Sequence, residues 1–158
     1  MGRTIHINPI GRIQVDGGVY CIRVDQQYRQ ALIHIDGFSH LTVIWWGNIF
    51  DQPEDRNRLV INKPYKSGPD KLGIFATHSP IRPNPILVST IYVQEIDRNE
   101  GLIYTPYIDA ENNSPVIDIK SYHKSERVKE CKVPDWCSHW PDWYEDSGTF
   151  DWAGEFNY

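Results

Sequence analysis

The chain lacks the sequence motifs of several large enzyme classes. It contains no G-x-x-x-x-G-K-[ST] phosphate loop, no G-x-G-x-x-G dinucleotide turn, no G-x-S-x-G nucleophile elbow and no H-E-x-x-H pair. In their families these motifs supply the phosphate-binding backbone, the activated serine or the zinc ligands. Their absence argues against a P-loop nucleotidase, a Rossmann-type oxidoreductase, an α/β-hydrolase and a zinc protease.

Cysteines and long apolar runs are also scarce. There are three cysteines, and no apolar run approaches the roughly 20 residues that span a bilayer. The N-terminal residues have no continuous apolar core of the length found in secretory leaders. We therefore expect a cytoplasmic protein with reduced thiols. Cys131, Cys137 and His139 could ligate a metal in principle, but their spacing is not a standard zinc pattern, so we expect no metal site.

Positive charge is in deficit and is absent from one end of the chain. The 16 Lys and Arg residues against 21 Asp and Glu give a formal net charge of −5, which disfavours unaided binding to a phosphate backbone. Residues 133–158 contain no Lys or Arg, but six acids and four of the six tryptophans. So many large rings are costly to leave in water. We predict one domain at residues 1–132 and an acidic, tryptophan-rich extension at 133–158, here called the tail, packed on the same domain or on a partner subunit.

Short β-rich segments dominate the rest of the chain. Their β-branched and aromatic residues are bounded by Gly, Pro, Asn and Asp, a pattern typical of all-β proteins. No window of 12 or more residues has a convincing 3.6 period, so we expect only short helices, near Phe38 and Ser125–Cys131. The sequence predicts a mainly β fold, an antiparallel β-barrel or a sandwich. The expected strands are Val19–Val24, Ala31–Ile35, Leu41–Trp46, Arg58–Ile61, Leu72–Thr77, Ile86–Ile96, Leu102–Ile108 and Val116–Ile119.

One segment, Thr77–Ile86, contains three prolines within six residues, and we call it the proline loop. Each proline fixes φ near −65° and biases the preceding residue toward extended geometry. The loop is therefore predicted to be stiff and to present Arg82 and Asn84 in a nearly fixed arrangement. A stiff loop with hydrogen-bonding groups can hold a small ligand, although a purely structural crossing would have the same composition.

Three segments in the same order resemble the TsaA-like (TrmO-type) family. Gly73–Ile86, GIFATHSPIRPNPI, is similar to the family's G-V-F-A-T-R-S-P-x-R-P-N-P-I signature. Asn112–Tyr122, NNSPVIDIKSY, resembles its D-G-T-P-V-L-D-I-K-P-Y. Upstream, Phe38–Leu41 and the Trp45-Trp46 pair resemble its F-S-H-L and aromatic strand. The best-known members are S-adenosylmethionine-dependent tRNA methyltransferases that act on threonylcarbamoyl-adenosine beside the anticodon.

The resemblance implies a β-barrel domain, usually dimeric, that holds S-adenosylmethionine near the subunit interface. Arg82 would pair with the cofactor carboxylate, and Trp46 or Tyr107 would offer an aromatic face to the adenine or the sulfonium. Asp118 and His78 are the candidates for a catalytic base. The cofactor-binding residues that it implies are Trp46, Gly47, His78, Ser79, Arg82, Asn84, Leu87, Asp109, Ala110, Glu111 and Asn112.

The chain departs from the family pattern at several positions. His78 replaces an arginine, Leu87 replaces a glycine, and Asn112-Asn113-Ser114 replaces Asp-Gly-Thr. Because Asn tolerates left-handed geometry, we expect the turn to survive. The longer bacterial members carry a further C-terminal domain that helps to bind RNA, where this chain has an acidic tail. The acceptor is therefore either tRNA or a small molecule, and a non-catalytic S-adenosylmethionine-binding domain is the alternative.

Overall fold

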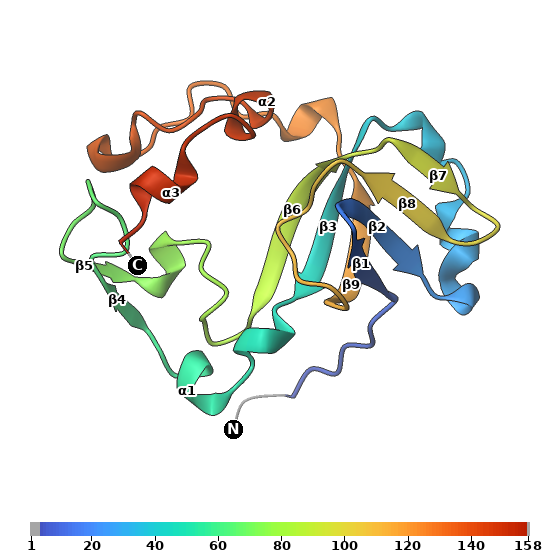
Figure 1. Ribbon diagram of the computed structural model, residues 1–158, viewed down its shortest axis with the longest axis horizontal. Coiled ribbons are helices and arrows are strands. Elements are labelled where there is room, and N and C mark those ends of the chain that lie inside the picture. Colours follow the sequence, from blue (N-terminus) through green and yellow to red (C-terminus); the bar gives the residue numbers. More distant parts are fainter. Residues whose placement is uncertain (1–3, 158) are drawn as a thin grey trace.

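The computed structural model describes residues 4–157, and it is mainly β, as predicted (Figure 1). Seven strands form one sheet in the order β6-β3-β9-β1-β2-β8-β7, and every neighbouring pair is antiparallel. The remaining two strands, β4 and β5, pair with each other. The strands are β1 (Gly11–Asp16), β2 (Val19–Val24), β3 (His40–Trp46), β4 (Val60–Asn62), β5 (Lys71–Gly73), β6 (Ile86–Tyr92), β7 (Glu95–Asp97), β8 (Leu102–Thr105) and β9 (Pro115–Ser121).

The helices are short, which agrees with the missing 3.6 period. The three α-helices have four residues each: α1 (Pro53–Arg56), α2 (Tyr144–Ser147) and α3 (Trp152–Glu155). The 3-10 helices are η1 (Gln26–Leu32), η2 (Ile35–Gly37), η3 (Asn48–Phe50), η4 (Ile74–Ala76), η5 (Lys124–Glu126) and η6 (Asp135–Cys137). Among residues 4–157, no helix combines the length and the apolar character that crossing a bilayer would require.

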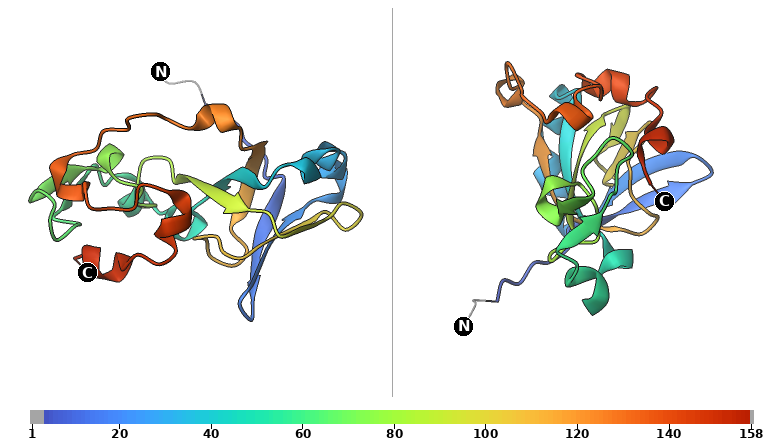
Figure 2. Two further views of the ribbon diagram at one scale, coloured as in Figure 1. Left: turned by 90° about the horizontal axis from the view of Figure 1, so that it is seen from above. Right: turned by 90° about the vertical axis from the view of Figure 1, so that its left-hand side faces the viewer.

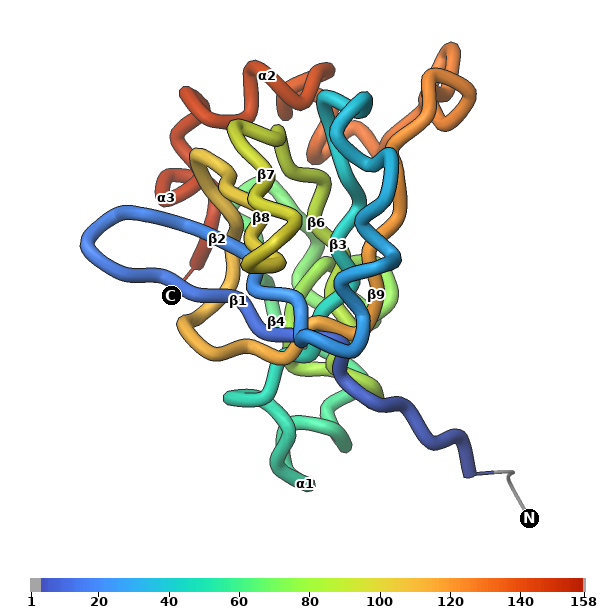
Figure 3. Tube along the Cα trace, turned by 90° about the vertical axis from the view of Figure 1, so that its right-hand side faces the viewer, coloured from blue at the N-terminus to red at the C-terminus, as the bar shows by residue number. Residues whose placement is uncertain are grey.

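Alternating side chains of the large sheet form the core. In β3 the buried positions are Leu41, Val43 and Trp45, and the residues between them are only partly buried. Since side chains alternate across a strand, this pattern places one face of β3 against the core. Ile13, Ile22, Ile91, Ile103 and Val116 belong to the same core, each with no exposed surface. The β1–β2 hairpin turns at Gly17 and Gly18, both with positive φ, and extends beyond the rest of the sheet (Figures 2 and 3).

Two expected strands differ from the structure for identifiable reasons, and one observed strand was not expected. The Ala31–Ile35 segment lies in η1 and η2, and His34 between them has a left-handed φ of 63°. The Leu72–Thr77 strand ends at Gly73, after which η4 turns the chain toward the proline loop. Periodicity did not reveal β1, which follows an exposed N-terminal segment.

The expected Ile86–Ile96 strand is split into β6 and β7. This break brings the two edges of the sheet close to each other. Val93 and Gln94 alone connect the two strands, although these lie at opposite ends of the strand order. The amide of Val93 donates to Ser39 O and that of Gln94 to Tyr104 O, both at 2.9 Å. The edges therefore approach at this corner, but within residues 4–157 no ladder joins β6 to β7. The sheet is antiparallel as predicted, whereas its closure into a barrel is not found.

The chain leaves the sheet after β3 and returns to it at β6. Trp46, the last residue of β3, is paired in register with Ile86, the first residue of β6. Residues 47–85 between them form α1, the β4–β5 hairpin and the proline loop, which lie to one side of the sheet (Figure 1). This excursion therefore begins and ends on the same rung of the sheet.

The tail contacts both the sheet and the excursion. The ring of Tyr144 packs edge-on against His40 of β3, with centroids 5.3 Å apart. Earlier in the tail, Trp136 stacks on Tyr65 of the β4–β5 hairpin at 5.2 Å, and Trp140 meets the same ring edge-on at 5.1 Å. The orange and red ribbon in Figure 1 follows this path from the sheet to β5. The division at residue 132 itself stays a prediction.

An ion pair closes this aromatic cluster. His139 Nε2 lies 3.0 Å from Glu155 Oε1, and Trp140 Nε1 donates to Glu155 Oε2 at 3.1 Å. The hydrogen bond from His139 and then that from Trp140 hold the pKa of Glu155 below its ordinary value of 4.5. The folded tail therefore favours the charged carboxylate.

We expect the tail to loosen in acid because of Glu155. A carboxyl group with a lowered pKa in the folded state contributes stability above its unfolded pKa and loses that contribution as the pH falls through its folded pKa. Between about pH 6 and about pH 3, the melting temperature of the protein should fall more than that of Glu155→Gln, which cannot titrate. Thermal unfolding followed by circular dichroism measures both proteins. Parallel pH profiles would show that Glu155 carries no such linkage.

Candidate functional site

A cavity of about 830 Å³ opens between the end of β3, the start of β6, the proline loop and the turn before β9. This volume lies in the upper part of the range of small-molecule sites, roughly 300–1,000 Å³. Exposed apolar side chains are part of its lining, among them Ile49, Phe75 and Val88, which we call the rim. The site is thus a cleft that solvent can reach, with room for more than one reacting group.

The proline loop holds its shape through its own polar groups. Thr77 Oγ1 donates to Ile74 O at 2.9 Å and accepts from the amide of Ser79 at 3.2 Å. Ser79 Oγ accepts from the amide of Ile81 at 3.2 Å. The Nη1 atom of Arg82 donates to Thr77 O at 3.2 Å and to Ser79 O at 3.3 Å. These bonds place the guanidinium of Arg82 on the cavity wall with one edge committed to the backbone.

Strand β3 and the proline loop meet closely at Gly47. Its amide donates to Pro85 O at 2.8 Å. A Cβ at this position would lie 3.3 Å from Leu87 Cδ1 and 3.4 Å from Pro85 Cβ, which is tighter than most contacts. Gly47 therefore permits a close approach that a side chain would impede. Leu87, where the family pattern has glycine, lies directly beside it.

The turn before β9 keeps the geometry expected of its asparagines. Asn113 has a φ of 68°, in the left-handed region, and its amide donates to Ile13 O at 2.8 Å. The predicted survival of the turn is thus confirmed. Asn112 Oδ1 accepts from the amide of Val15 at 3.0 Å. The side chain of Asn112 thereby anchors the turn to β1, and it lines a second cavity together with Val15.

The structure brings most of the predicted binding residues to this cavity. It is lined by Gly47, His78, Arg82, Asn84, Leu87, Asp109, Ala110 and Glu111. Trp46, Ser79 and Asn112 are not among its lining residues. Tyr107, the other predicted aromatic platform, instead packs on Tyr20 and donates to Asp109 at 3.4 Å. Burial, with the charge of Asp109, raises the pKa of Tyr107, so its phenol stays protonated at neutral pH.

The two predicted catalytic bases are placed differently. His78 lines the cavity. Asp118 lies on β9 opposite Ile44, where its Oδ2 pairs with Lys120 Nζ at 2.8 Å and its Oδ1 accepts from the amide of Ile119. The hydrogen bond with Asp118 raises the pKa of Lys120. Since Asp118 does not line this cavity, its role as a base stays a prediction without support from a contact.

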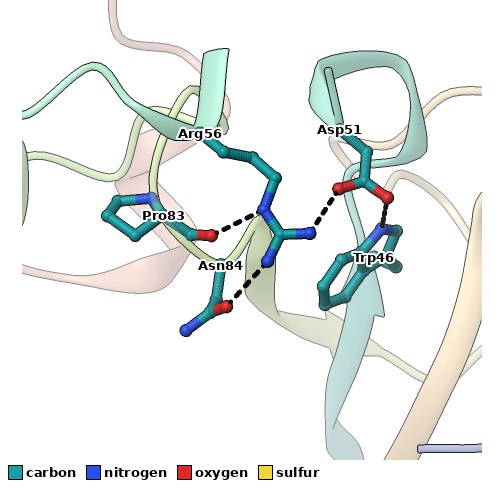
Figure 4. A network of polar contacts seen from close by, with 5 residues as sticks. All are labelled: Trp46, Asp51, Arg56, Pro83 and Asn84. Carbon is teal, nitrogen blue, oxygen red and sulfur yellow. Dashed lines mark hydrogen bonds and ion pairs between the residues drawn. The ribbon is translucent and has the colours of Figure 1, made fainter. Parts of the chain in front are cut away.

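A polar network behind the cavity was not foreseen. Arg56 of α1 donates from Nε to Pro83 O at 2.9 Å, from Nη1 to Asp51 Oδ1 at 3.0 Å and from Nη2 to Asn84 Oδ1 at 3.1 Å (Figure 4). Trp46 Nε1 donates to Asp51 Oδ2 at 3.0 Å, and the guanidinium carbon lies 5.8 Å from the centroid of the Trp46 ring. In the sequence Arg56 stands in a mixed charge run, DQPEDRNR, which gives no signal of this role.

The cysteines and His139 do not form a metal centre. Among the residues described, no group of three or more His, Cys, Asp and Glu side chains is arranged to hold a metal. Cys137 is buried and its thiol donates to Pro134 O at 3.4 Å, whereas Cys131 is exposed. His139 is paired with Glu155.

Residues 6–126 match the family model described as the tRNA-methyltransferase O N-terminal domain. The chain is 31% identical over 134 residues to a probable S-adenosyl-L-methionine-binding protein of Methanocaldococcus jannaschii, covering 81% of this chain and 98% of that protein. It is 35% identical over 117 residues to a protein of Pyrococcus horikoshii with the same description, covering 73% and 81%.

The fold also resembles solved structures of TrmO. For one from Pseudomonas aeruginosa the TM-score is 0.61 at 21% identity, over 82% of this chain and 62% of that one. For a second TrmO structure the TM-score is 0.64 at 21% identity, over 83% and 64%. The chain thus spans less than two thirds of the length of these structures, and the likeness extends to the fold.

Proposed function

The chain belongs to the family of the tRNA-methyltransferase O N-terminal domain, and on that premise we propose that it is an S-adenosylmethionine-dependent methyltransferase. The carrying observation is the convergence of the proline loop, the end of β3 and the 109–111 turn on one cleft. These segments are far apart in the sequence, and together they supply cationic, anionic and apolar groups. Relatives described as S-adenosyl-L-methionine-binding proteins support the choice of ligand.

The groups on the cavity wall suit the charges of this cofactor. S-adenosylmethionine carries a carboxylate, an ammonium group and a sulfonium cation. Arg82 offers the edge of its guanidinium that the loop backbone does not use, which fits a carboxylate. Asp109 and Glu111, on the facing turn, suit the cationic groups. Gly47 lets the cofactor approach the backbone at the end of β3.

When bound, the cofactor supplies an activated methyl group on its sulfur. The protein then has mainly to align the acceptor with that methyl group, which can contribute several kcal/mol without a covalent nucleophile. His78 lines the cleft and is the residue we propose to accept a proton from the acceptor. The exposed rim formed by Ile49, Phe75 and Val88 would exclude water from one side of a bound acceptor.

For the acceptor, we propose the modified adenosine beside the tRNA anticodon. The family description and the open, aromatic rim support this choice, since Phe75 is 81% exposed and a base can stack on such a ring.

The exposed side chains of Val88 and Tyr92 on the edge strand β6 are consistent with a homodimer, which we also propose from the family resemblance. Light scattering of the purified protein would measure the dimer.

Binding and transfer experiments test this proposal in sequence. Calorimetry with S-adenosylmethionine and S-adenosylhomocysteine should show association with both. Radiolabelled donor should then transfer its label to total tRNA and not to a metabolite extract. Label in the metabolites alone would replace tRNA by a small-molecule acceptor, and binding without any transfer would favour a non-catalytic binding protein. Absence of binding would reject the proposal as a whole.

A further inference from the structure

Arg56 joins the tip of the proline loop to the segment that follows β3. It is not among the residues that line the cavity, but Pro83 and Asn84, which accept two of its hydrogen bonds, are. Its third acceptor, Asp51, also holds Trp46, the residue before Gly47. All three nitrogens of the guanidinium donate hydrogen bonds (Figure 4). We call Arg56 and its three acceptor residues, Asp51, Pro83 and Asn84, the clamp.

These contacts join segments that are far apart along the chain. Between Arg56 and Pro83 the chain runs out through β4 and back through β5. The β3–β6 ladder holds the end of the proline loop, Ile86, opposite Trp46, and the contacts of Arg56 extend this support to Pro83 and Asn84. Arg56 supplies contacts to both sides, and Gly47 adds one more through its amide.

The bond from Arg56 also fixes the orientation of the Asn84 amide. A guanidinium has only donors, so the group of Asn84 that meets Arg56 must be its acceptor, Oδ1. The Nδ2 group then points away from Arg56, as Figure 4 shows. Because Asn84 lines the cavity, its contribution to a ligand is a hydrogen-bond donor.

We infer that Arg56 is a positioning residue that orients Asn84 to donate to an acceptor atom of the bound ligand, such as a carboxylate oxygen or an adenine ring nitrogen. This inference rests on the proposed binding of S-adenosylmethionine. Arg56 acts through Asn84 and the proline loop and does not touch the ligand.

The two residues should therefore be coupled in ligand binding. With S-adenosylhomocysteine as the calorimetric probe, Arg56→Ala should weaken binding about tenfold, and Asn84→Ala by a similar factor. If Arg56 acts through Asn84, adding Arg56→Ala to Asn84→Ala should weaken binding by less than about threefold more. Two independent tenfold losses that multiply would overturn the inference, as would unchanged binding by Arg56→Ala.

A second variant separates the clamp from the donor. Asn84→Asp retains an acceptor for Arg56, and its charge strengthens that contact, but an ionised carboxylate has no N–H to donate. This variant should keep the melting temperature of the unmodified protein and still bind the probe about tenfold more weakly. Unimpaired binding by Asn84→Asp would contradict the assignment of a donor role.

The matched control is Arg58→Ala, which removes an exposed arginine two residues along the chain. It should bind S-adenosylhomocysteine like the unmodified protein. If the unmodified protein does not bind the probe, the proposed function fails. If it binds and the Arg56 and Asn84 variants bind equally well, only the present inference fails.

Discussion

Replacing Arg82 by alanine should weaken the binding of S-adenosylmethionine by about 10- to 100-fold, the range expected for loss of a hydrogen-bonded charged group. The substitution acts twice. It removes the cation proposed to meet the carboxylate of the cofactor, and it removes the two bonds from Nη1 to Thr77 O and Ser79 O. The proline loop would thus lose both its ligand contact and part of its own support. Calorimetry with S-adenosylmethionine measures the loss.

Arg82→Lys separates the two contributions of Arg82. Lysine keeps the positive charge but lacks the planar fork, so it can serve a carboxylate or the loop carbonyls but not both in the same geometry. We expect its affinity to lie between those of the unmodified protein and Arg82→Ala. Equal affinity of all three proteins would show that Arg82 is a structural residue of the loop and not a ligand-binding one.

Replacing Trp140 by alanine should cost the protein about 2–4 kcal/mol of stability, somewhat less than the loss of a fully buried tryptophan. The ring of Trp140 lies 5.1 Å from that of Tyr65, 5.6 Å from that of Trp136 and 5.3 Å from that of Trp152, and its Nε1 donates to Glu155. It therefore joins the tail to the β4–β5 hairpin. For a chain of this length, the loss should lower the melting temperature by about 4–16 °C.

The tail offers its own control for this experiment. Trp143 has the same side chain but is 65% exposed, so Trp143→Ala should change the stability by no more than about 0.5 kcal/mol. Because β5 leads through η4 into the proline loop, Trp140→Ala should also weaken the binding of S-adenosylhomocysteine. Equal melting temperatures for the two variants would show that the aromatic cluster does not stabilise the fold.

The sequence predicted those parts of the fold that local patterns determine. Runs of β-branched and aromatic residues bounded by turn residues located β2, β3 and β9. The corner at Val93-Gln94 was not predicted, because the residues on both sides favour strands. The bend is set by hydrogen bonds to Ser39 and Tyr104, which are distant in the sequence. Whether β6 and β7, the two edge strands, pair with each other depends on this corner. Local pattern therefore could not predict that the sheet does not close into a barrel.

For the site, motif resemblance found residues on the wall of the cleft and missed those behind it. His78, Arg82 and Asn84 lie in a quoted motif, and the structure places all three at one cavity. Arg56 and Asp51 lie in a charged segment that resembles an ordinary solvated surface. Their contacts to Pro83 and Trp46 depend on how the chain folds back after β5, which no spacing in the sequence reveals.

The pairing of Trp46 with Ile86 has a consequence for how this protein can diversify. Everything from residue 47 to residue 85 is an insertion at a single rung, so its length and composition can change without shifting any ladder of the seven-stranded sheet. The seven-stranded sheet then stays constant, and residues 47–85, here called the lobe, are the part that can vary. Divergent members could acquire different acceptors by remodelling residues 48–76 of this lobe, while Gly47 and the proline loop keep the residues proposed to bind the donor.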